Sequence, residues 1–223
     1  MFTTRSHPVY AGLKALALVT CLSLTGIAGR VHAAEPEAPF VEKMADASLL
    51  PTLRKGGLVL YMRHGTTDNS RADRAPKVDL TDCNTQRVLN EEGRRLSVAV
   101  GQAIAKARIP VGEVIHSPMC RARDSAKLAF PHHALRQALD LAYTANLTTE
   151  EKKPVLALTR QLLSTPVAAG SNRVIVAHAP NLADLMGYFV KPEGTVVVLR
   201  PLGEGQFEYL GSIAPQAWSQ LLP

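Results

Sequence analysis

Short apolar strands alternate with amphipathic helices along most of this sequence, and that alternation constrains the fold more than any other feature. Residues 57–62 and 173–177 have the largely apolar character of strands that are buried on both faces. Residues 91–108 lie between them and carry apolar side chains at the 3.6-residue spacing of a helix. Strands that alternate with helices in this way predict an α/β fold with a mostly parallel sheet.

The rest of the chain continues the pattern and ends differently. The other predicted elements are, in chain order, a strand at 112–116 and helices at 119–130, 150–163 and 182–189. Residues 194–199 and 206–210 are separated by a turn rich in Pro and Gly, which indicates a terminal β-hairpin. We therefore expect an antiparallel hairpin at one edge of the sheet, and a polar loop at 66–90.

Residues 1–33 are typical of a secretory signal peptide. Two basic residues precede an apolar stretch at 15–29, and small residues around Ala33 match a cleavage site. The apolar stretch is shorter than the roughly 20 residues that a membrane-spanning helix needs. The sequence therefore predicts cleavage near Ala33, a mature domain of residues 34–223, a periplasmic or secreted location, and no stable membrane insertion after cleavage.

Charge and composition exclude two classes of protein. The chain carries 25 Lys+Arg and 19 Asp+Glu, for a formal net charge of +6. Removal of residues 1–33, which contain three of the basic residues and no acidic one, leaves a charge of about +3, too small to indicate a nucleic-acid partner. Hydrophobic residues at 46% and charged residues at 20% are ordinary for a globular domain, so a mainly disordered chain is excluded.

Two cysteines, Cys83 and Cys120, remain in the mature chain. Cys83 lies in the loop that leaves the first strand, and Cys120 directly precedes Arg121, so both are expected near one edge of the sheet. An oxidising compartment favours a disulfide between them, and the alternative is two separate buried thiols. Neither belongs to a Cys or His pattern with metal-ligand spacing, and no metal site is predicted.

Polar residues follow the ends of three predicted strands. Arg63 and His64 follow the first strand, Arg121 comes shortly after the second, and His178 follows the strand at 173–177. Taken alone, a histidine at a strand end is usually structural and an arginine is usually a surface charge. Because the carboxyl ends of parallel strands lie at one edge of a sheet, we expect these four side chains to meet there.

Such a cluster has the chemistry to bind and transfer a phosphoryl group. Guanidinium groups match phosphate oxygens in a bidentate manner. A neutral imidazole beside them is a nucleophile toward phosphorus, and the arginines favour its neutral form. A second histidine, if protonated, donates to the oxygens where charge develops. The residues predict phosphoryl transfer through a phosphohistidine, without a metal or another cofactor.

Three motifs, in this order, resemble the histidine phosphatase (phosphoglycerate mutase-like) superfamily from about residue 57 to the C-terminus. The motifs are Arg63-His64-Gly65, Ser117-Pro118-x-x-Arg121-Ala122-x-x-Ser125-Ala126 and Val176-Ala177-His178. The resemblance implies a three-layer α/β/α sandwich with His64 as the nucleophile and Arg63, Arg121 and His178 as the catalytic phosphate pocket. The tail of the chain looks like small exported bacterial members of the superfamily.

The resemblance does not assign the general acid. The segment 139–151 does not match the acidic segment of mutase-like members, and Ala179 stands where phytase-like members carry an acid. Asp140, Glu150 and Glu151 are the leading candidates, and Asp68 and Asp124 are further ones. Phosphohistidine phosphatases of the superfamily work without such an acid, because a good leaving group needs little protonation.

The resemblance implies an exported phosphomonoester hydrolase of the histidine acid phosphatase-like type, acting on a small phosphorylated substrate. Two alternatives remain. One is a phosphatase for the heptose phosphate of the lipopolysaccharide core, and the other is a phosphate or phospho-sugar binding protein without catalysis. The sequence identifies neither the substrate nor the oligomeric state.

Overall fold

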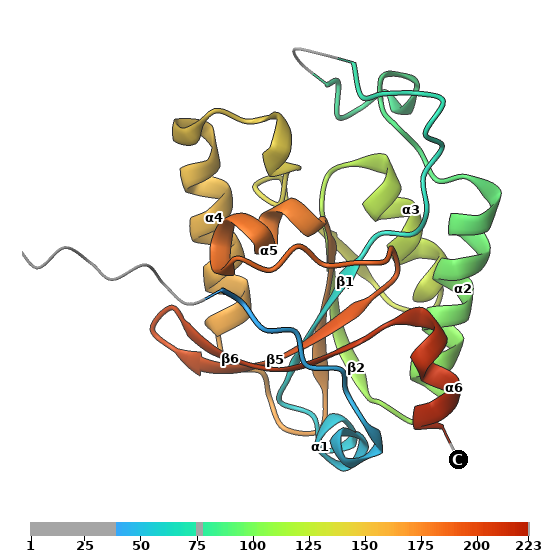
Figure 1. The fold of residues 1–223 in the computed structure, drawn as a ribbon, viewed down its shortest axis with the longest axis vertical. Helices are drawn as coiled ribbons and strands as arrows, with labels where there is room; N and C mark the ends of the chain where they lie inside the picture. The colour runs from blue at the N-terminus through green and yellow to red at the C-terminus, as the bar shows by residue number, and fades with distance from the viewer. Residues whose placement is uncertain (1–38, 75–77, 223) are drawn as a thin grey trace, which may run out of the picture. The chain divides into compact units, whose positions relative to one another are not determined.

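A six-stranded sheet runs through the described part of the chain, residues 39–74 and 78–222 of the computed structural model (Figure 1). The strands are β1 (Val59–Arg63), β2 (Val111–His116), β3 (Leu135–Gln137), β4 (Asn172–Ala177), β5 (Val196–Gly203) and β6 (Gln206–Ile213). Their order is β3-β2-β4-β1-β5-β6, with parallel pairing from β3 to β1 and antiparallel pairing from β1 to β6. The predicted parallel sheet with an antiparallel hairpin at its edge is confirmed.

Helices cover both faces of this sheet. The α-helices are α1 (Leu50–Lys55), α2 (Glu91–Lys106), α3 (Cys120–Ala129), α4 (Thr149–Ser164), α5 (Ala179–Met186) and α6 (Trp218–Leu221). The short 3-10 helices are η1 (Ala47–Leu49), η2 (Cys83–Thr85), η3 (Thr144–Asn146) and η4 (Pro215–Ala217). In Figure 1, α2, α3 and α6 lie on one side of the sheet, and α4 and α5 lie on the other. The arrangement is the expected three-layer α/β/α sandwich.

Neighbouring residues of each central strand contribute to different cores. In β1, Leu60 and Met62 belong to the apolar core beside α2 and α3, whereas Val59 and Tyr61 belong to the core beside α4 and α5. A strand with an apolar core on each face shows no alternation of polar and apolar residues. The continuous apolar runs in the sequence have this origin.

Some elements differ from the sequence-based expectation, among them α5 and β3. Helix α5 begins at Ala179 rather than 182, because His178 is its N-cap and Pro180 lies in the first turn, where its missing N–H is not needed. Strand β3 was not predicted, since three residues at the sheet edge are too few to show a period. Within the described ranges, no helix combines the length and apolar character needed to cross a bilayer.

The predicted signal peptide and the start of the predicted mature domain lie outside the described residues. The signal peptide covers residues 1–33, and the description begins at residue 39. Export and the domain boundary therefore stay predictions.

The structure contains the predicted disulfide between Cys83 in η2 and Cys120 at the start of α3, with Cα atoms 5.8 Å apart. Beside the disulfide, the Cys120 N–H donates a hydrogen bond to Oε1 of the buried Gln86 at 2.8 Å. The loop that follows β1 is thereby joined to the helix that carries Arg121.

We expect reduction of this disulfide to lower the free energy of unfolding. The two cysteines are 37 positions apart in the sequence. Loop-closure entropy for a loop of that length predicts that the free energy of unfolding falls by about 3–4 kcal/mol. Denaturant unfolding of the oxidised protein and of the Cys83→Ser/Cys120→Ser double variant measures the difference. Two alkylatable thiols per unreduced chain, found by mass spectrometry, would contradict the pairing.

Candidate active site

The carboxyl ends of β1, β2 and β4 lie next to one another because these strands are adjacent and parallel. Arg63 is the last residue of β1 and pairs in register with Ala177, the last residue of β4. The His64 N–H donates to the Ala177 carbonyl at 3.1 Å, so His64 and His178 leave the sheet side by side. Their ring centroids are 5.3 Å apart. The structure thus brings together side chains that the sequence placed at one edge.

His64 is held with one ring nitrogen engaged and the other available. Its Nδ1–H donates to the carbonyl of Gly65 at 2.8 Å, and the side chain is buried. In a neutral imidazole only one nitrogen carries a proton, so Nε2 of His64 has a free electron pair. That nitrogen is the nucleophilic one.

The surroundings keep this imidazole neutral. Burial, followed by the nearby Arg121 guanidinium, holds the pKa of His64 well below its ordinary value of 6.5. Desolvation and a like charge both disfavour the imidazolium form. His64 therefore retains a nucleophilic nitrogen at neutral and mildly acidic pH.

Ser117 sets the proton position on His178. The Ser117 hydroxyl lies 2.7 Å from Nε2 of His178 and accepts a bond from the Met119 N–H at 3.3 Å. Its own proton finds an acceptor only at Nε2 among the described residues, so Ser117 donates to that nitrogen. His178 consequently carries its proton on Nδ1.

The sequence left open whether the second histidine is protonated. Burial, then Arg121, holds the pKa of His178 well below 6.5, so the ring is neutral at physiological pH. A neutral ring with the proton on Nδ1 still donates one hydrogen bond. The hydroxyl of Tyr61 anchors the backbone here, accepting from the His178 N–H at 3.1 Å and donating to its carbonyl at 2.7 Å.

Arg121 is fully buried at the start of α3. Its Nη1 donates to Oδ1 of Asp73 at 2.9 Å and to the Arg87 carbonyl at 3.4 Å. The guanidinium lies over the ring of Tyr143, 4.8 Å from its centroid. Asp73 compensates the buried charge, while one edge of the guanidinium stays without a protein partner.

Arg63 is oriented by the loop after α5. Its Nη1 donates to the Val190 carbonyl at 2.8 Å, and its Nη2 is paired with the carboxylate of Glu193. These contacts fix the plane of the guanidinium. The Nε–H stays buried without an acceptor.

Unpaired buried nitrogens are concentrated in this cluster. In the described part of the chain, four of the six belong to it: Nε of Arg63, Nε and Nη2 of Arg121, and Nδ1 of His178. The other two are Nδ1 of His133 and Nε1 of Trp218. A buried donor without an acceptor costs about 1–3 kcal/mol. A tetrahedral oxyanion presents several acceptor oxygens at once and would satisfy such a set, as a dianion also matching the two guanidinium charges.

Close backbone packing holds the loop after β1 in place. A Cβ added to Gly65 would lie 2.4 Å from the carbonyl oxygen of Gly93, and one added to Gly93 would lie 1.9 Å from that of Thr66. The Gly65 N–H donates to Ser125, whose hydroxyl donates to the Arg121 carbonyl. Gly65 therefore allows this close approach of the backbone, and Ser125 connects the first two motifs.

The three leading candidates for the general acid have other surroundings. Asp140 is exposed, and the exposed Glu150 is paired with Lys153 at 2.5 Å. Glu151 closes the capping box of α4 by accepting from the Thr148 N–H and hydroxyl. Within residues 39–74 and 78–222, none of the three forms a hydrogen bond or ion pair with the histidines or arginines of the cluster.

Sequence reasoning missed several residues that complete the site. Asp73 and Arg87 lie in the loop at 66–90, which the sequence predicts only as polar, and Tyr143 lies in the segment 139–151 that does not match mutase-like members. Ser117 was quoted in a motif without a role. No local pattern marks these residues, because each reaches the cluster through contacts distant in sequence, such as the 48 residues between Asp73 and Arg121.

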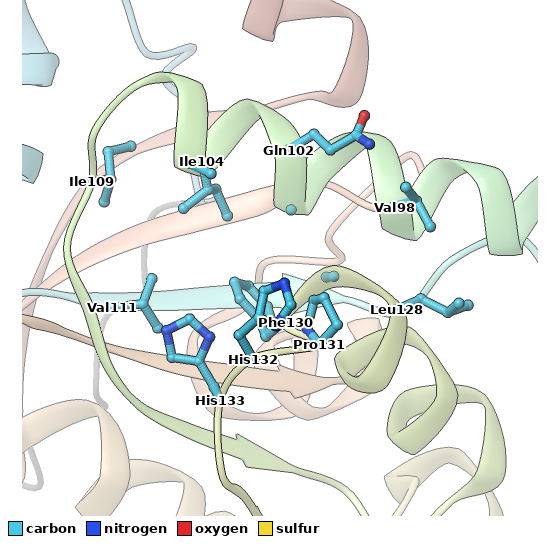
Figure 2. A pocket seen from close by; sticks show the side chains of 13 residues that line it. Val98, Gln102, Ile104, Ile109, Val111, Leu128, Phe130, Pro131, His132 and His133 are labelled. Atoms are coloured by element: carbon cyan, nitrogen blue, oxygen red, sulfur yellow. The ribbon is translucent and has the colours of Figure 1, made fainter.

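A cavity of about 360 Å³ lies elsewhere, between α2 and the segment that follows α3 (Figure 2). Val98, Gln102 and Ile104 of α2 face Phe130 and His133 across it. The lining is mostly apolar and includes none of the four residues of the cluster. This cavity is therefore separate from the candidate active site.

Comparisons with known proteins agree with this geometry. The family model of the histidine phosphatase superfamily (branch 1) matches residues 59–147. The chain is similar to the protein histidine phosphatase SixA complexed with tungstate, with a TM-score of 0.50 and 14% identity over 71% of this chain and 97% of that one. It is also similar to a mycobacterial glucosyl-3-phosphoglycerate phosphatase in complex with VO3, with a TM-score of 0.50 and 16% identity over 71% and 100%. Identities this low show a shared fold, and no curated protein matches the chain.

Proposed function

We propose that the chain is a member of the histidine phosphatase superfamily, whose family model matches residues 59–147. We propose further that it is an exported phosphomonoesterase acting through a phosphohistidine on His64. The observation that supports this most strongly is the cluster of unpaired buried nitrogens on Arg63, Arg121 and His178, beside the free Nε2 of His64. The binding of a phosphoryl group needs the unpaired donors, and its transfer needs the free Nε2 of His64.

The reaction has two steps. Nε2 of His64 attacks phosphorus, and the bond from phosphorus to the ester oxygen breaks with its electron pair going to that oxygen. The oxygen takes a proton from water and leaves as the alcohol. Arg63, Arg121 and His178 hold the three remaining oxygens and stabilise the charge that develops on them. Water then hydrolyses the phosphohistidine and releases phosphate, which returns His64 to its neutral form.

The carboxylates nearest the cluster support the arginines. Asp73 accepts from Arg121, and Glu193 is paired with Arg63. Both carboxylates thus hold guanidinium groups in place. Esters whose alcohol leaves readily fit this site best, because such a leaving group needs little protonation.

Phosphate release and covalent labelling test the proposal together. The purified mature protein is assayed on sugar phosphates, nucleotides, phosphopeptides, p-nitrophenyl phosphate and core oligosaccharide, and is quenched under denaturing alkaline conditions after exposure to labelled substrate. We expect turnover and a labelled histidine that is absent from His64→Asn. Release from core oligosaccharide alone would favour the heptose-phosphate alternative, and binding without turnover or label would favour a non-catalytic binding protein.

We expect Ser117→Ala to lower kcat/KM about 10- to 100-fold, because the proton of the His178 ring is then no longer confined to Nδ1. Without the donor to Nε2, the ring can place its proton there and turn an unprotonated Nδ1 toward the oxyanion, which removes one charge-stabilising bond. Nitrogen NMR shifts of the His178 ring report the tautomer directly, which a general loss of stability would not alter. If Ser117→Ala keeps both the NMR shifts of the wild-type His178 ring and the wild-type activity, Ser117 does not set the tautomer of His178.

A further inference from the structure

A strap of irregular chain, residues 39–46, precedes η1 and lies along β6 (Figure 1, the blue segment that crosses β6 toward α1). Two backbone bonds join the strap to this edge strand. The Ala45 N–H donates to the Ser212 carbonyl at 2.9 Å, and the Ser212 N–H donates to the Lys43 carbonyl at 2.8 Å. Contacts of this kind cover an exposed sheet edge, which is a sufficient role for the backbone of the strap.

The side chains of the strap hold Tyr188, the second residue after α5. The ring of Phe40 stacks on the ring of Tyr188 with centroids 4.4 Å apart, and its edge meets the ring of Tyr209 at 4.9 Å. The Tyr188 hydroxyl donates to the Glu42 carboxylate and lies 2.8 Å from the hydroxyl of Ser212. Burial, followed by the bond to Glu42, raises the pKa of this hydroxyl, so it stays protonated and donates. A stacked ring and a charge-assisted hydrogen bond together fix Tyr188 in place.

Tyr188 begins a three-residue segment whose other two members contact Arg63. The guanidinium carbon of Arg63 lies 5.6 Å from the centroid of the Phe189 ring. The carbonyl of the buried Val190 accepts from Nη1 of Arg63 at 2.8 Å. Because peptide units are planar and stiff, a shift of Tyr188 is transmitted over two of them to the atoms that orient this guanidinium.

We propose that the strap is a positioning element of the active site, which fixes the guanidinium of Arg63 through Tyr188. Phe40 and Glu42 are its positioning residues. Cover of the sheet edge needs only the backbone bonds to β6, whereas the side chains of Phe40 and Glu42 both contact Tyr188. The inference rests on the proposed function, because it presumes that Arg63 binds the phosphoryl group.

Hydrolysis of p-nitrophenyl phosphate by the mature protein tests this role. We expect Phe40→Ala to lower kcat/KM about 10-fold at a temperature where circular dichroism shows a folded variant, since a 1 Å misplacement can cost about 100-fold. In an Arg63→Ala background the same change should alter kcat/KM by less than about twofold, because the group that the strap positions is gone. Val41→Ala is the matched control, because Val41 lies in the same strap with 81% of its surface exposed. It should leave kcat/KM unchanged.

The NMR resonance of the Arg63 Nε–H reports the position of the guanidinium without turnover. We expect this resonance to shift in Phe40→Ala and in Glu42→Ala, and to keep its parent value in Val41→Ala. Glu42→Ala removes no aromatic ring, so its effect does not come from a lost ring current. Glu42 is also exposed, so this variant is expected to fold even if Phe40→Ala does not.

An unchanged Arg63 resonance in the folded variants, or an unchanged kcat/KM, would leave the strap as a cover for β6 and overturn the inference. Equal losses of kcat/KM with and without Arg63 would also overturn it, because the strap would then act on another group. A parent protein that neither hydrolyses p-nitrophenyl phosphate nor binds orthophosphate would overturn the proposed function. The Arg63 resonance in the variants would then still decide whether the strap positions this side chain.

Discussion

Replacement of His64 by alanine is expected to reduce kcat by about four to six powers of ten, the loss seen when a covalent nucleophile is removed. The expectation follows from its Nε2, which is unprotonated and belongs to a cluster with buried donors that lack partners among the described residues. Arg63 and Arg121 remain in His64→Ala and still bind phosphate. Affinity for orthophosphate should therefore persist when turnover is lost.

The fold should survive this substitution. His64 follows a strand end and belongs to neither apolar core. Among the residues that the structure describes, its side chain bonds only to the adjacent Gly65 carbonyl. His64→Asn is the gentler control, since it keeps a polar amide of similar size. Circular dichroism and phosphate release on both variants decide the matter. Turnover near that of the parent protein in either folded variant would disprove a phosphohistidine mechanism on His64.

The location of the site was predictable because it depends on topology. The ends of parallel strands meet at one sheet edge. Arg63 comes at the end of one of the three predicted strands, and Arg121 and His178 come after the other two. The disulfide followed from the same reasoning, since the segments that hold Cys83 and Cys120 meet at that edge. Each of these predictions needed only the order of elements along the chain.

The inner arrangement of the site was not predictable, because it depends on loop conformation. Asp73 and Arg87 lie in a polar loop with no hydrophobic period, and contacts with Arg121 orient them. The protonation of His178 depends on Ser117, 61 residues away. No sequence pattern indicates whether a histidine at a strand end is charged or which of its nitrogens carries the proton.

Arg121→Lys is expected to lower kcat/KM about 100- to 1000-fold although the positive charge is kept. The guanidinium offers Nε and Nη2 to an oxyanion while Nη1 holds Asp73 and the Arg87 carbonyl. A lysine ammonium is a point donor on a flexible stem and cannot serve both sides at once. Loss of one donor to a developing oxyanion in other enzymes costs a factor of this size.

Arg123→Lys supplies the matched comparison, two residues farther along α3. Arg123 is partly exposed and directs its guanidinium to Asp124 and to the sulfur of Cys83, not to the phosphoryl site. We expect this change to alter kcat/KM by less than about threefold, as for an exposed ion pair of small energetic effect. Equal losses in the two variants would mean that α3 needs arginine for packing or helix stability at either position. A large loss confined to Arg121→Lys, in a variant that unfolds like the parent protein, would indicate a planar, forked donor facing the substrate, because the same change of side chain is made in both variants.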